Sequence, residues 1–477
     1  MEVERIDDYI LEIKQSNGMN VPVKIVANKS IEKNLFNDKT LQQAVNASKL
    51  PGIVGSMWVM PDAHEGYGFP VGGVGAFDAE EGIISPGAVG FDINCGVRVI
   101  KTDLTYNDIK DKLNELGKEL FRRVPSGVGS KLNIGLTKKD LDYIATEGVD
   151  YIIGKGFGLE EDKRFIEENG HIEGADVRYV SEMASKRGLK ELGTIGAGNH
   201  FLEVQRVERI DDEDLAKRFG LFKDQIVIML HTGSRGYGHQ ICSDYLIKLN
   251  DYQKRNKIKL EDPQLSYAHV NSKEAEEYLA AMRAAVNYAF TNREIITDIV
   301  RDVFAKVLSI NKDNLEMPVL YDVAHNIVKL EEHIVENKRM KLFVHRKGAT
   351  RAFGPNAKGV PDAYKDVGQP VLIPGSMGTA SYILAGREKA MHLTFGSSCH
   401  GAGRVMSRHK ALREIPASKT LEIMKSKGII LEVRDKRLVS EEAEFAYKNV
   451  DDVVESVSGA GISKIVSRDI PLVVVKG

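Results

Sequence analysis

Four apolar runs, each strand-like in composition and each ending in a histidine, constrain this 477-residue chain more than any other feature. The histidines are His200, His231, His325 and His400, and the last stands inside a glycine- and serine-rich loop. A single histidine at a strand end is usually an ordinary hydrogen-bonded residue. Four in the same setting, among 12 in the sequence, indicate strands whose ends meet around one site.

The segment Phe91–Gly96 adds a carboxylate and a thiol to this histidine pattern. It holds Asp92 and Cys95, and Cys95 is one of only three cysteines. A small cysteine in a tight turn more often packs than reacts, so the segment alone favours a structural role. Flanking glycines and Asn94, however, expose backbone and leave room for an ion or a phosphate to approach.

A transition-metal site follows from combining these residues. Imidazole and thiolate suit Zn²⁺, Mn²⁺, Fe²⁺ or Co²⁺ better than Mg²⁺ or Ca²⁺, and one thiolate can bridge two ions. The spacing matches no compact zinc finger, so the ligands must converge from distant strands and a catalytic site is predicted. The candidate ligands are Asp92, Cys95, His200, His231 and His325.

Two glycine-rich loops provide an independent sign of phosphate or base binding. Pro374–Ser381 and Gly401–Arg404 offer backbone N–H groups and hydroxyls that no large side chain obstructs. Neither is a Walker loop, because the lysine after the final glycine is missing. Basic residues near these loops fit either a polyanion site or a solvated face. They are Lys338, Arg339, Lys341, His345, Arg346, Lys347 and Arg351, and Arg404, Arg408, His409, Lys410 and Arg413.

Composition excludes a generally basic surface for nucleic acid. With 66 Lys and Arg against 68 Asp and Glu, the net charge is −2, so any polyanion site must be local. The odd number of widely spaced cysteines argues against a disulfide framework and for a reducing compartment. The charged N-terminus and the lack of a run of about 18 apolar residues predict a cytoplasmic protein without a membrane span.

The pattern along the chain predicts an α/β fold in one large or two closely packed domains. Short apolar runs cut by glycines between 52 and 90 indicate strands and tight turns, with Asp62, His64 and Glu65 at a strand end. Residues about 105–170 and 240–310 are typical of charged helical insertions with solvated faces. No G-x-G-x-x-G follows an N-terminal strand, so a Rossmann sheet is not expected.

Eight motifs closely resemble those of the RtcB family of RNA-splicing ligases. They occur in one order from about Pro61 to the C-terminal Lys476-Gly477, and none departs from the family pattern at a functional position. The matching segments are Pro61–Pro70, Gly90–Arg98, Gly198–Glu203, His231–Gly236, Asp322–Asn326, His345–Arg351, Pro374–Gly378 and Ser398–Arg404.

This resemblance implies one catalytic domain over residues 1–477, with β-sheets and surrounding helices around a central metal cleft. It implies a ligase that uses GTP and two Mn²⁺ ions to join RNA 2′,3′-cyclic phosphate or 3′-phosphate ends to 5′-hydroxyl ends, as in tRNA splicing and RNA repair. The expected partners are RNA, such as tRNA exon halves, and GTP. A protein activator is left open, and a monomer without a membrane partner is expected.

The family likeness also assigns roles to individual residues. Asp92, Cys95 and His200 would hold one Mn²⁺, and Cys95, His231 and His325 the other. His400 would attack the α-phosphate of GTP to give a guanylylated histidine. Asp62 would orient the incoming hydroxyl or serve only as a structural strand end. Residues expected around the nucleotide are Asn199, Phe201, Glu203, Asn326, Pro374, Gly375, Ser376, Met377, Ser381, Gly401, Ala402, Gly403, Tyr447 and Lys476.

Residue chemistry supports two of these roles and leaves two rival functions open. A neutral imidazole can attack phosphorus, and a carboxylate such as Glu203 can accept from the N1–H and N2–H₂ edge of guanine and so reject adenine. One rival is a dinuclear metallophosphoesterase that needs no nucleotide and no covalent histidine. The other is a non-catalytic RNA-binding protein with a structural metal. Neither rival requires His400.

Overall fold

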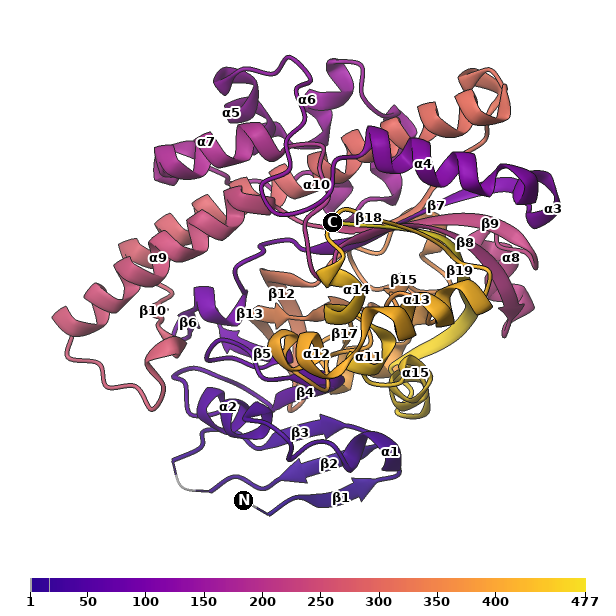
Figure 1. Ribbon diagram of the computed structural model, residues 1–477. Coiled ribbons are helices and arrows are strands. Elements are labelled where there is room, and N and C mark those ends of the chain that lie inside the picture. The colour runs from indigo at the N-terminus through magenta and orange to yellow at the C-terminus, as the bar shows by residue number, and fades with distance from the viewer. Residues whose placement is uncertain (1, 17) are drawn as a thin grey trace.

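The computed structural model describes residues 2–16 and 18–477, and two large β-sheets form its centre (Figure 1). Most neighbouring strands in these sheets are antiparallel. Within the described residues, parallel pairing joins β3 to β4 and β18 to β19. A Rossmann sheet needs consecutive parallel strands, so the prediction of a mixed α/β fold without one is confirmed.

The first sheet has seven strands and contains the N-terminal part of the chain together with one later hairpin. In spatial order its strands are β1 (Glu4–Asp7), β2 (Ile10–Ile13), β3 (Val23–Val26), β4 (Met57–His64), β5 (Val71–Asp78), β13 (Lys338–Lys347) and β12 (Asn326–Val335).

The second sheet has eight strands and carries most of the candidate ligands. Its spatial order is β11 (Val319–Ala324), β7 (Gly96–Thr105), β9 (Gln225–Thr232), β8 (Phe201–Ile210), β19 (Ser463–Lys476), β16 (Ser381–Gly386) and β15 (Pro370–Ile373), with β18 (Ile430–Val433) also paired to β19. Two short pairs complete the β-structure: β6 (Ile83–Ile84) with β10 (Ala268–His269), and β14 (Ala349–Arg351) with β17 (Ser397–Cys399).

Helices cover these sheets in groups that follow the chain. Helices α4 and α10 pack on one face of the eight-stranded sheet, α5, α6 and α9 pack on α10, and α7 packs on α9, while α2 and α15 pack on the seven-stranded sheet (Figure 1). The helices are α1 (Lys29–Glu32), α2 (Thr40–Ala47), α3 (Tyr106–Ile109), α4 (Leu113–Arg123), α5 (Lys138–Glu147), α6 (Val149–Gly154), α7 (Glu182–Glu191), α8 (Glu213–Phe219), α9 (Arg235–Arg255), α10 (Lys273–Leu308), α11 (Glu388–Leu393), α12 (Arg408–Glu414), α13 (Ala417–Ser426), α14 (Arg437–Glu441) and α15 (Val450–Gly459).

Helix α10 contradicts the expectation that the charges of 240–310 are solvated. It is 36 residues long, and Arg293 and Glu294 at its middle are fully buried. Burial of these charges is tolerated because each has an ionic partner on the sheet. Arg98 of β7 lies 2.5 Å from Glu294 and 2.7 Å from Asp322 of β11, and Arg293 lies 2.9 Å from Asp322.

Arg293 also ties α10 to the segment that carries Cys95. Its Nη1 donates to the carbonyl oxygens of Asn94 and Thr232 at 2.9 and 2.8 Å, and its Nη2 donates to Asn94 Oδ1 at 3.0 Å. Asn94 is buried and has φ +51°, a left-handed conformation in which asparagine is one of the better-tolerated residues. One guanidinium therefore fixes the backbone beside both Cys95 and His231.

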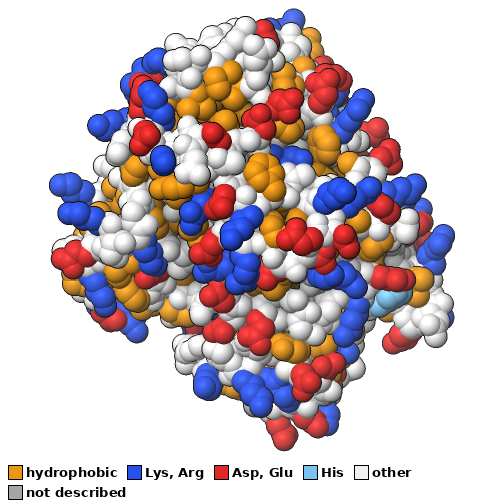
Figure 2. Space-filling view, turned by 90° about the vertical axis from the view of Figure 1, so that its right-hand side faces the viewer, with side chains coloured by type: hydrophobic (Ala, Val, Ile, Leu, Met, Phe, Trp, Pro, Cys, Tyr) orange, Lys and Arg blue, Asp and Glu red, His pale blue; other side chains and the backbone are white. Residues whose placement is uncertain are grey.

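The surface gives no sign of a membrane segment or of one dominant charge. None of the helices in the described part of the chain is both long and apolar enough to cross a membrane. Lys and Arg alternate with Asp and Glu over the face drawn in Figure 2, as the net charge of −2 leads one to expect.

Replacing Arg293 with Met should destabilise the fold by about 3–5 kcal/mol, because two backbone carbonyls lose a donor and Asp322 loses one of its two cations. The urea midpoint of unfolding, followed by circular dichroism, measures the change. Arg178→Met is the control, since Arg178 pairs with Asp176 at an exposed position, and it should leave the midpoint almost unchanged. Equal midpoints for the two variants would contradict this account.

Candidate active site

The register of the eight-stranded sheet brings the predicted ligands to one edge. Across neighbouring antiparallel strands, Gly96 pairs with both Thr232 and Ala324, and Phe201 pairs with His231. The residues just outside these pairs are Cys95, His200 and His325, so the start of one strand lies beside the end of the next. Residues up to 230 positions apart in the sequence therefore lie close together because their strands pair, and no long loop has to carry them to the site.

One of the four expected strand-like runs is not a strand. Residues 193–200 form turns, and β8 begins only at Phe201, directly after His200. Gly193 and Gly198 have φ of +75° and +73°, which extended strand backbone does not allow. His231 ends its run as expected, and His325 and His400 directly follow β11 and β17.

The five candidate ligands form a continuous row of donor atoms. Asp92 Oδ2 lies 3.0 Å from His200 Nε2, which lies 3.1 Å from Cys95 Sγ. Cys95 Sγ lies 3.3 Å from His231 Nε2, which in turn lies 3.3 Å from His325 Nε2. Ligands around a shared ion with bonds of ~2.1–2.3 Å stand roughly 3–3.7 Å apart. The row therefore has the dimensions of a metal site, with Cys95 at its centre.

The protonation of these groups also fits a cation. Burial raises the pKa of Cys95 well above its usual range, and the charge of Asp92 adds to the effect. Burial likewise lowers the pKa of His231 and His325 well below the usual range, so both imidazoles are neutral and can bind a metal. His231 and His325 therefore add no positive charge beside the Asp92 carboxylate, and a metal ion would supply it.

His400 is held by Asp62 of β4. Asp62 Oδ2 accepts hydrogen bonds from His400 Nδ1 at 2.5 Å, from the His400 backbone N–H at 3.0 Å and from the Gly401 N–H at 3.2 Å. Burial acts to raise the pKa of Asp62, but His400 outweighs it and the pKa is lowered. An ionised Asp62 that accepts from Nδ1–H leaves Nε2 of His400 with a free lone pair.

A cavity of about 260 Å³ joins the row of five candidate ligands, called the metal row below, to His400. Its wall contains all five candidate ligands, His400, and the predicted nucleotide residues Asn199, Asn326, Pro374, Gly375, Ser376, Gly401, Ala402, Gly403 and Tyr447. The structure places the other predicted residues, Phe201, Glu203, Met377, Ser381 and Lys476, in the protein behind this wall, where all are at least nine-tenths buried.

Glu442, which no sequence motif indicated, connects the cavity to the buried residues behind its wall. Its carboxylate is fully buried, accepts from the Tyr447 hydroxyl, and lies 3.1 Å from Arg404 Nη1 and 3.9 Å from Lys476 Nζ. Burial acts to raise the pKa of Glu442, yet Lys476 and Arg404 hold it below the usual range. No motif marks this residue, because its cationic partners come from distant parts of the sequence.

The two glycine-rich loops both line the cavity with His400. In the first loop, Ser381 Oγ accepts from the Gly375 N–H at 3.1 Å, and Ser376 Oγ donates to the Glu442 carbonyl at 2.9 Å. In the second, Gly403 has φ +73°, and a Cβ there would lie 1.8 Å from the Asp62 carbonyl oxygen. Only glycine allows this loop to pack directly on β4.

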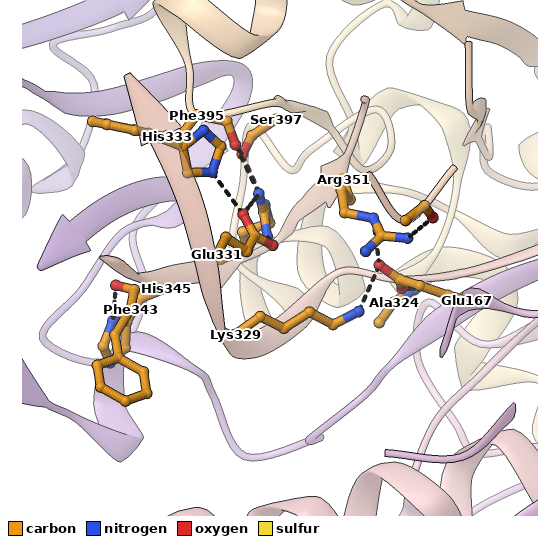
Figure 3. A network of polar contacts seen from close by, with 12 residues as sticks. Glu167, Ala324, Lys329, Glu331, His333, Phe343, His345, Arg351, Phe395 and Ser397 are labelled. Carbon is orange, nitrogen blue, oxygen red and sulfur yellow. Dashed lines mark hydrogen bonds and ion pairs between the residues drawn. The ribbon is translucent and has the colours of Figure 1, made fainter. Parts of the chain in front are cut away.

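The first basic cluster of the sequence is largely internal. Arg351 Nε lies 3.2 Å from Glu167, and Lys329, which is outside the cluster, lies 2.9 Å from the same carboxylate. Figure 3 shows both contacts. Arg346 forms a two-bond ion pair with Glu331 at 2.6 and 2.8 Å. Lys347 donates to three backbone carbonyls, and burial lowers its pKa to about 7. These residues support the fold, and Lys338, Arg339 and Lys341 remain exposed.

His345 lies away from the cavity. It sits beside Phe77, its Nε2 accepts from the Ser85 N–H at 3.2 Å, and burial lowers its pKa to about 3. In the second cluster, Arg404 and Arg408 line the cavity, while His409, Lys410 and Arg413 lie on exposed positions of α12. Lys347 of the first cluster also lines the cavity, but three backbone carbonyls occupy its N–H donors. Arg404 and Arg408 are therefore the part of these clusters available to a bound polyanion at the site.

Comparison with known proteins agrees with the geometry. A family model described as tRNA-splicing ligase RtcB matches residues 43–477. The chain is 50% identical to a tRNA-splicing ligase RtcB of Archaeoglobus fulgidus and 49% identical to one of Thermococcus kodakarensis, with 100% of this chain and 99% of each relative covered. It is also 46% identical to an RNA-splicing ligase RtcB homolog 1 of Entamoeba dispar, covering 98% of this chain and 89% of that protein. The cavity joins a cluster of Cys and His side chains to a histidine that Asp62 holds in place. The family model and these relatives match nearly the whole chain, so this chain belongs to the tRNA-splicing ligase RtcB family.

Proposed function

We propose that this RtcB-family ligase joins RNA 2′,3′-cyclic phosphate or 3′-phosphate ends to 5′-hydroxyl ends through a guanylylated His400. The observation that carries the proposal is the Asp62–His400 contact. It directs Nδ1 to the carboxylate and leaves Nε2 as the nucleophile in a cavity shared with the metal row. The role of Asp62 is then to fix the tautomer and orientation of His400, instead of orienting the RNA hydroxyl.

In the first step, His400 Nε2 attacks the α-phosphorus of GTP. A P–N bond forms, the bond to the β-phosphate oxygen breaks, and pyrophosphate leaves. The RNA 3′-phosphate, produced from a cyclic end by water, then takes GMP from the histidine. Finally the 5′-hydroxyl attacks this activated phosphate, a 3′,5′-phosphodiester forms, and GMP leaves.

Two Mn²⁺ ions held by Asp92, Cys95 and His200 and by Cys95, His231 and His325 would neutralise charge on the phosphates. The mixed thiolate, imidazole and carboxylate donors fit such ions. Arg404 and Arg408 line the same cavity and can bind phosphate oxygens. The N–H groups of Ala402 and Gly403, in the loop that lines the cavity wall, can serve as further donors.

The proposed substrates are tRNA exon halves or broken RNA with the same ends, in the cytoplasm. A single chain contains every residue used above, so we propose that a monomer is active. A protein activator is compatible with this scheme and does not supply a required residue. A metallophosphoesterase is less well supported, since the metal row alone would serve it and the held His400 would have no function.

Replacing Cys95 with Ala should remove the ligand shared by both ions. We expect Mn²⁺ content, measured by mass spectrometry after desalting, to fall from two ions per chain, and self-guanylylation to fall more than about 100-fold. Cys242→Ala is the control, because Cys242 is a buried cysteine of α9 that lies away from the cavity wall. Two ions retained in Cys95→Ala would contradict the ligand assignment.

Replacing His400 with Ala should abolish the covalent GMP adduct, by more than about 1,000-fold, while leaving the Mn²⁺ content at two per chain. Incubation with α-³²P-GTP and Mn²⁺, followed by denaturing electrophoresis, measures the adduct, and joining of a 3′-phosphate RNA to a 5′-hydroxyl RNA should fail in parallel. His409→Ala, an exposed neighbour on α12, should keep both activities. An acid-labile GTP-derived adduct on His400→Ala would place the nucleophile on another residue.

Replacing Glu203 with Gln should weaken discrimination between GTP and ATP by roughly 10- to 100-fold, because the amide presents one acceptor and one donor where guanine needs two acceptors. Single-turnover labelling with each nucleotide measures the ratio of the two rates at subsaturating concentration. If that ratio is unchanged, base recognition must lie elsewhere.

A further inference from the structure

A buried glutamine joins the two side chains that we expect to contact the base. Gln205 Nε2 donates to Glu203 Oε2 at 2.7 Å and to Ser381 Oγ at 3.0 Å, and all three residues are at most 2% exposed. Glu203 and Gln205 lie on β8 and Ser381 lies on β16, with β19 between them. Gln205 pairs with Pro471 of β19, next to an irregularity in the strand register. Its side chain reaches across β19 to Ser381 on β16.

The hydrogen-bond polarity of this cluster is determined by its chemistry. An ionised carboxylate can only accept, so the Gln205 amide must present its NH₂ group to Glu203. Both amide hydrogens are then used, one by Glu203 and one by Ser381. Ser381 Oγ accepts from Gln205 and also from the Gly375 N–H at 3.1 Å, so both of its lone pairs are occupied. The hydroxyl hydrogen of Ser381 is therefore left to donate to a ligand.

The resulting pattern matches guanine and opposes adenine. Guanine presents N1–H and N2–H₂ as donors and O6 and N7 as acceptors. Glu203 offers acceptors to the first pair, and Ser381 offers a donor to the second. Adenine presents its N6–H₂ donor where guanine has the O6 acceptor, so the same two side chains would face groups of the wrong polarity.

We infer that Gln205 is a positioning residue that fixes Glu203 as an acceptor and Ser381 as a donor, and thereby sets the preference for a guanine nucleotide. This inference rests on the proposed use of GTP. Gln205 acts through its two partners and needs no contact with the base. The sequence alone gives no sign of this role, since a single glutamine in a strand of mixed polarity belongs to no motif.

Glu203 must be ionised for this arrangement, and its surroundings make ionisation sensitive to Gln205. Burial raises the pKa of Glu203 to about 7, while the hydrogen bond from Gln205 and the charge of Lys476 on β19 lower it. Removing the Gln205 donor should therefore raise the pKa further. Guanine binding requires the ionised form, so it should increase as pH rises through this pKa, and the midpoint should move to higher pH in a variant without the donor.

The test compares Gln205→Met with the wild-type protein in self-guanylylation with GTP, ITP and ATP from pH 6 to 9. In Gln205→Met we expect the GTP concentration that gives half the maximal rate to rise roughly 10- to 100-fold. The ratio of the rates with GTP and ATP should fall by a similar factor, and the midpoint of the pH profile should move to higher pH. The rate at saturating GTP should change little, because His400 and the metal row are untouched. ITP, which lacks N2–H₂, should show a smaller loss than GTP.

Gln225→Met is the matched control for loss of a buried amide. Gln225 is 2% exposed, and its Nε2 donates to the carbonyls of Thr102 and Gly220 at 2.7 and 3.1 Å on the same sheet. Its loss should lower stability but leave the GTP:ATP ratio and the pH midpoint unchanged. If Gln205→Met is insoluble, Gln205→Glu keeps the shape and can donate only when protonated, so its GTP:ATP ratio should fall as pH rises, opposite to the wild type.

The possible outcomes separate this inference from the proposed function. Wild-type protein that forms no adduct with GTP would overturn the proposed function. Normal GTP labelling of the wild type, with the same GTP:ATP ratio and pH midpoint in Gln205→Met, would overturn the role of Gln205 alone. In Gln205→Glu, a ratio that rises with pH as in the wild type would also overturn it.

Discussion

The hydrogen bonds of Arg293 are the interaction on which the rest of the site depends. This one buried guanidinium connects α10 to Asp322 of β11, to the carbonyl beside His231 and to Asn94 beside Cys95. A metal site needs ligands held to within fractions of an ångström, and ligands at strand ends are otherwise free to fray. The long helix thus serves less as a cover for the sheet than as a rigid support that fixes several strand ends at once.

Antiparallel pairing explains why the sequence could predict that the candidate ligands lie close together. His231 and His325 end or follow apolar β-branched runs, and in a sheet such ends meet at an edge. The run before His200 was predicted wrongly, because its glycines at 193 and 198 adopt positive φ and make turns. His200 still lies beside the other candidate ligands, since β8 starts immediately after it and pairs with the end of β9.

Buried charge was the part that the sequence could not reveal. Arg293, Glu294, Arg346 and Arg351 belong to segments whose charge density indicates solvated faces, and each is buried because its partner lies on a distant segment. The same limit applies to Glu442 and Gln205. What sets the role of these residues is the neighbour across the fold, and no local pattern or spacing carries that information.

The active site lies where the two large sheets meet, and this arrangement explains why both are needed for ligation. The eight-stranded sheet supplies the metal row, whereas Asp62 belongs to β4 of the seven-stranded sheet and holds His400. Three hydrogen bonds from His400 and Gly401 compensate for burying the Asp62 carboxylate, and Gly403 lets the loop approach within contact of β4. A phosphoesterase would need only the donors of the eight-stranded sheet in this scheme. Burying the Asp62 carboxylate to orient His400, which follows β17 of a separate strand pair, has a clear function in the proposed ligation, where His400 takes part in the chemistry.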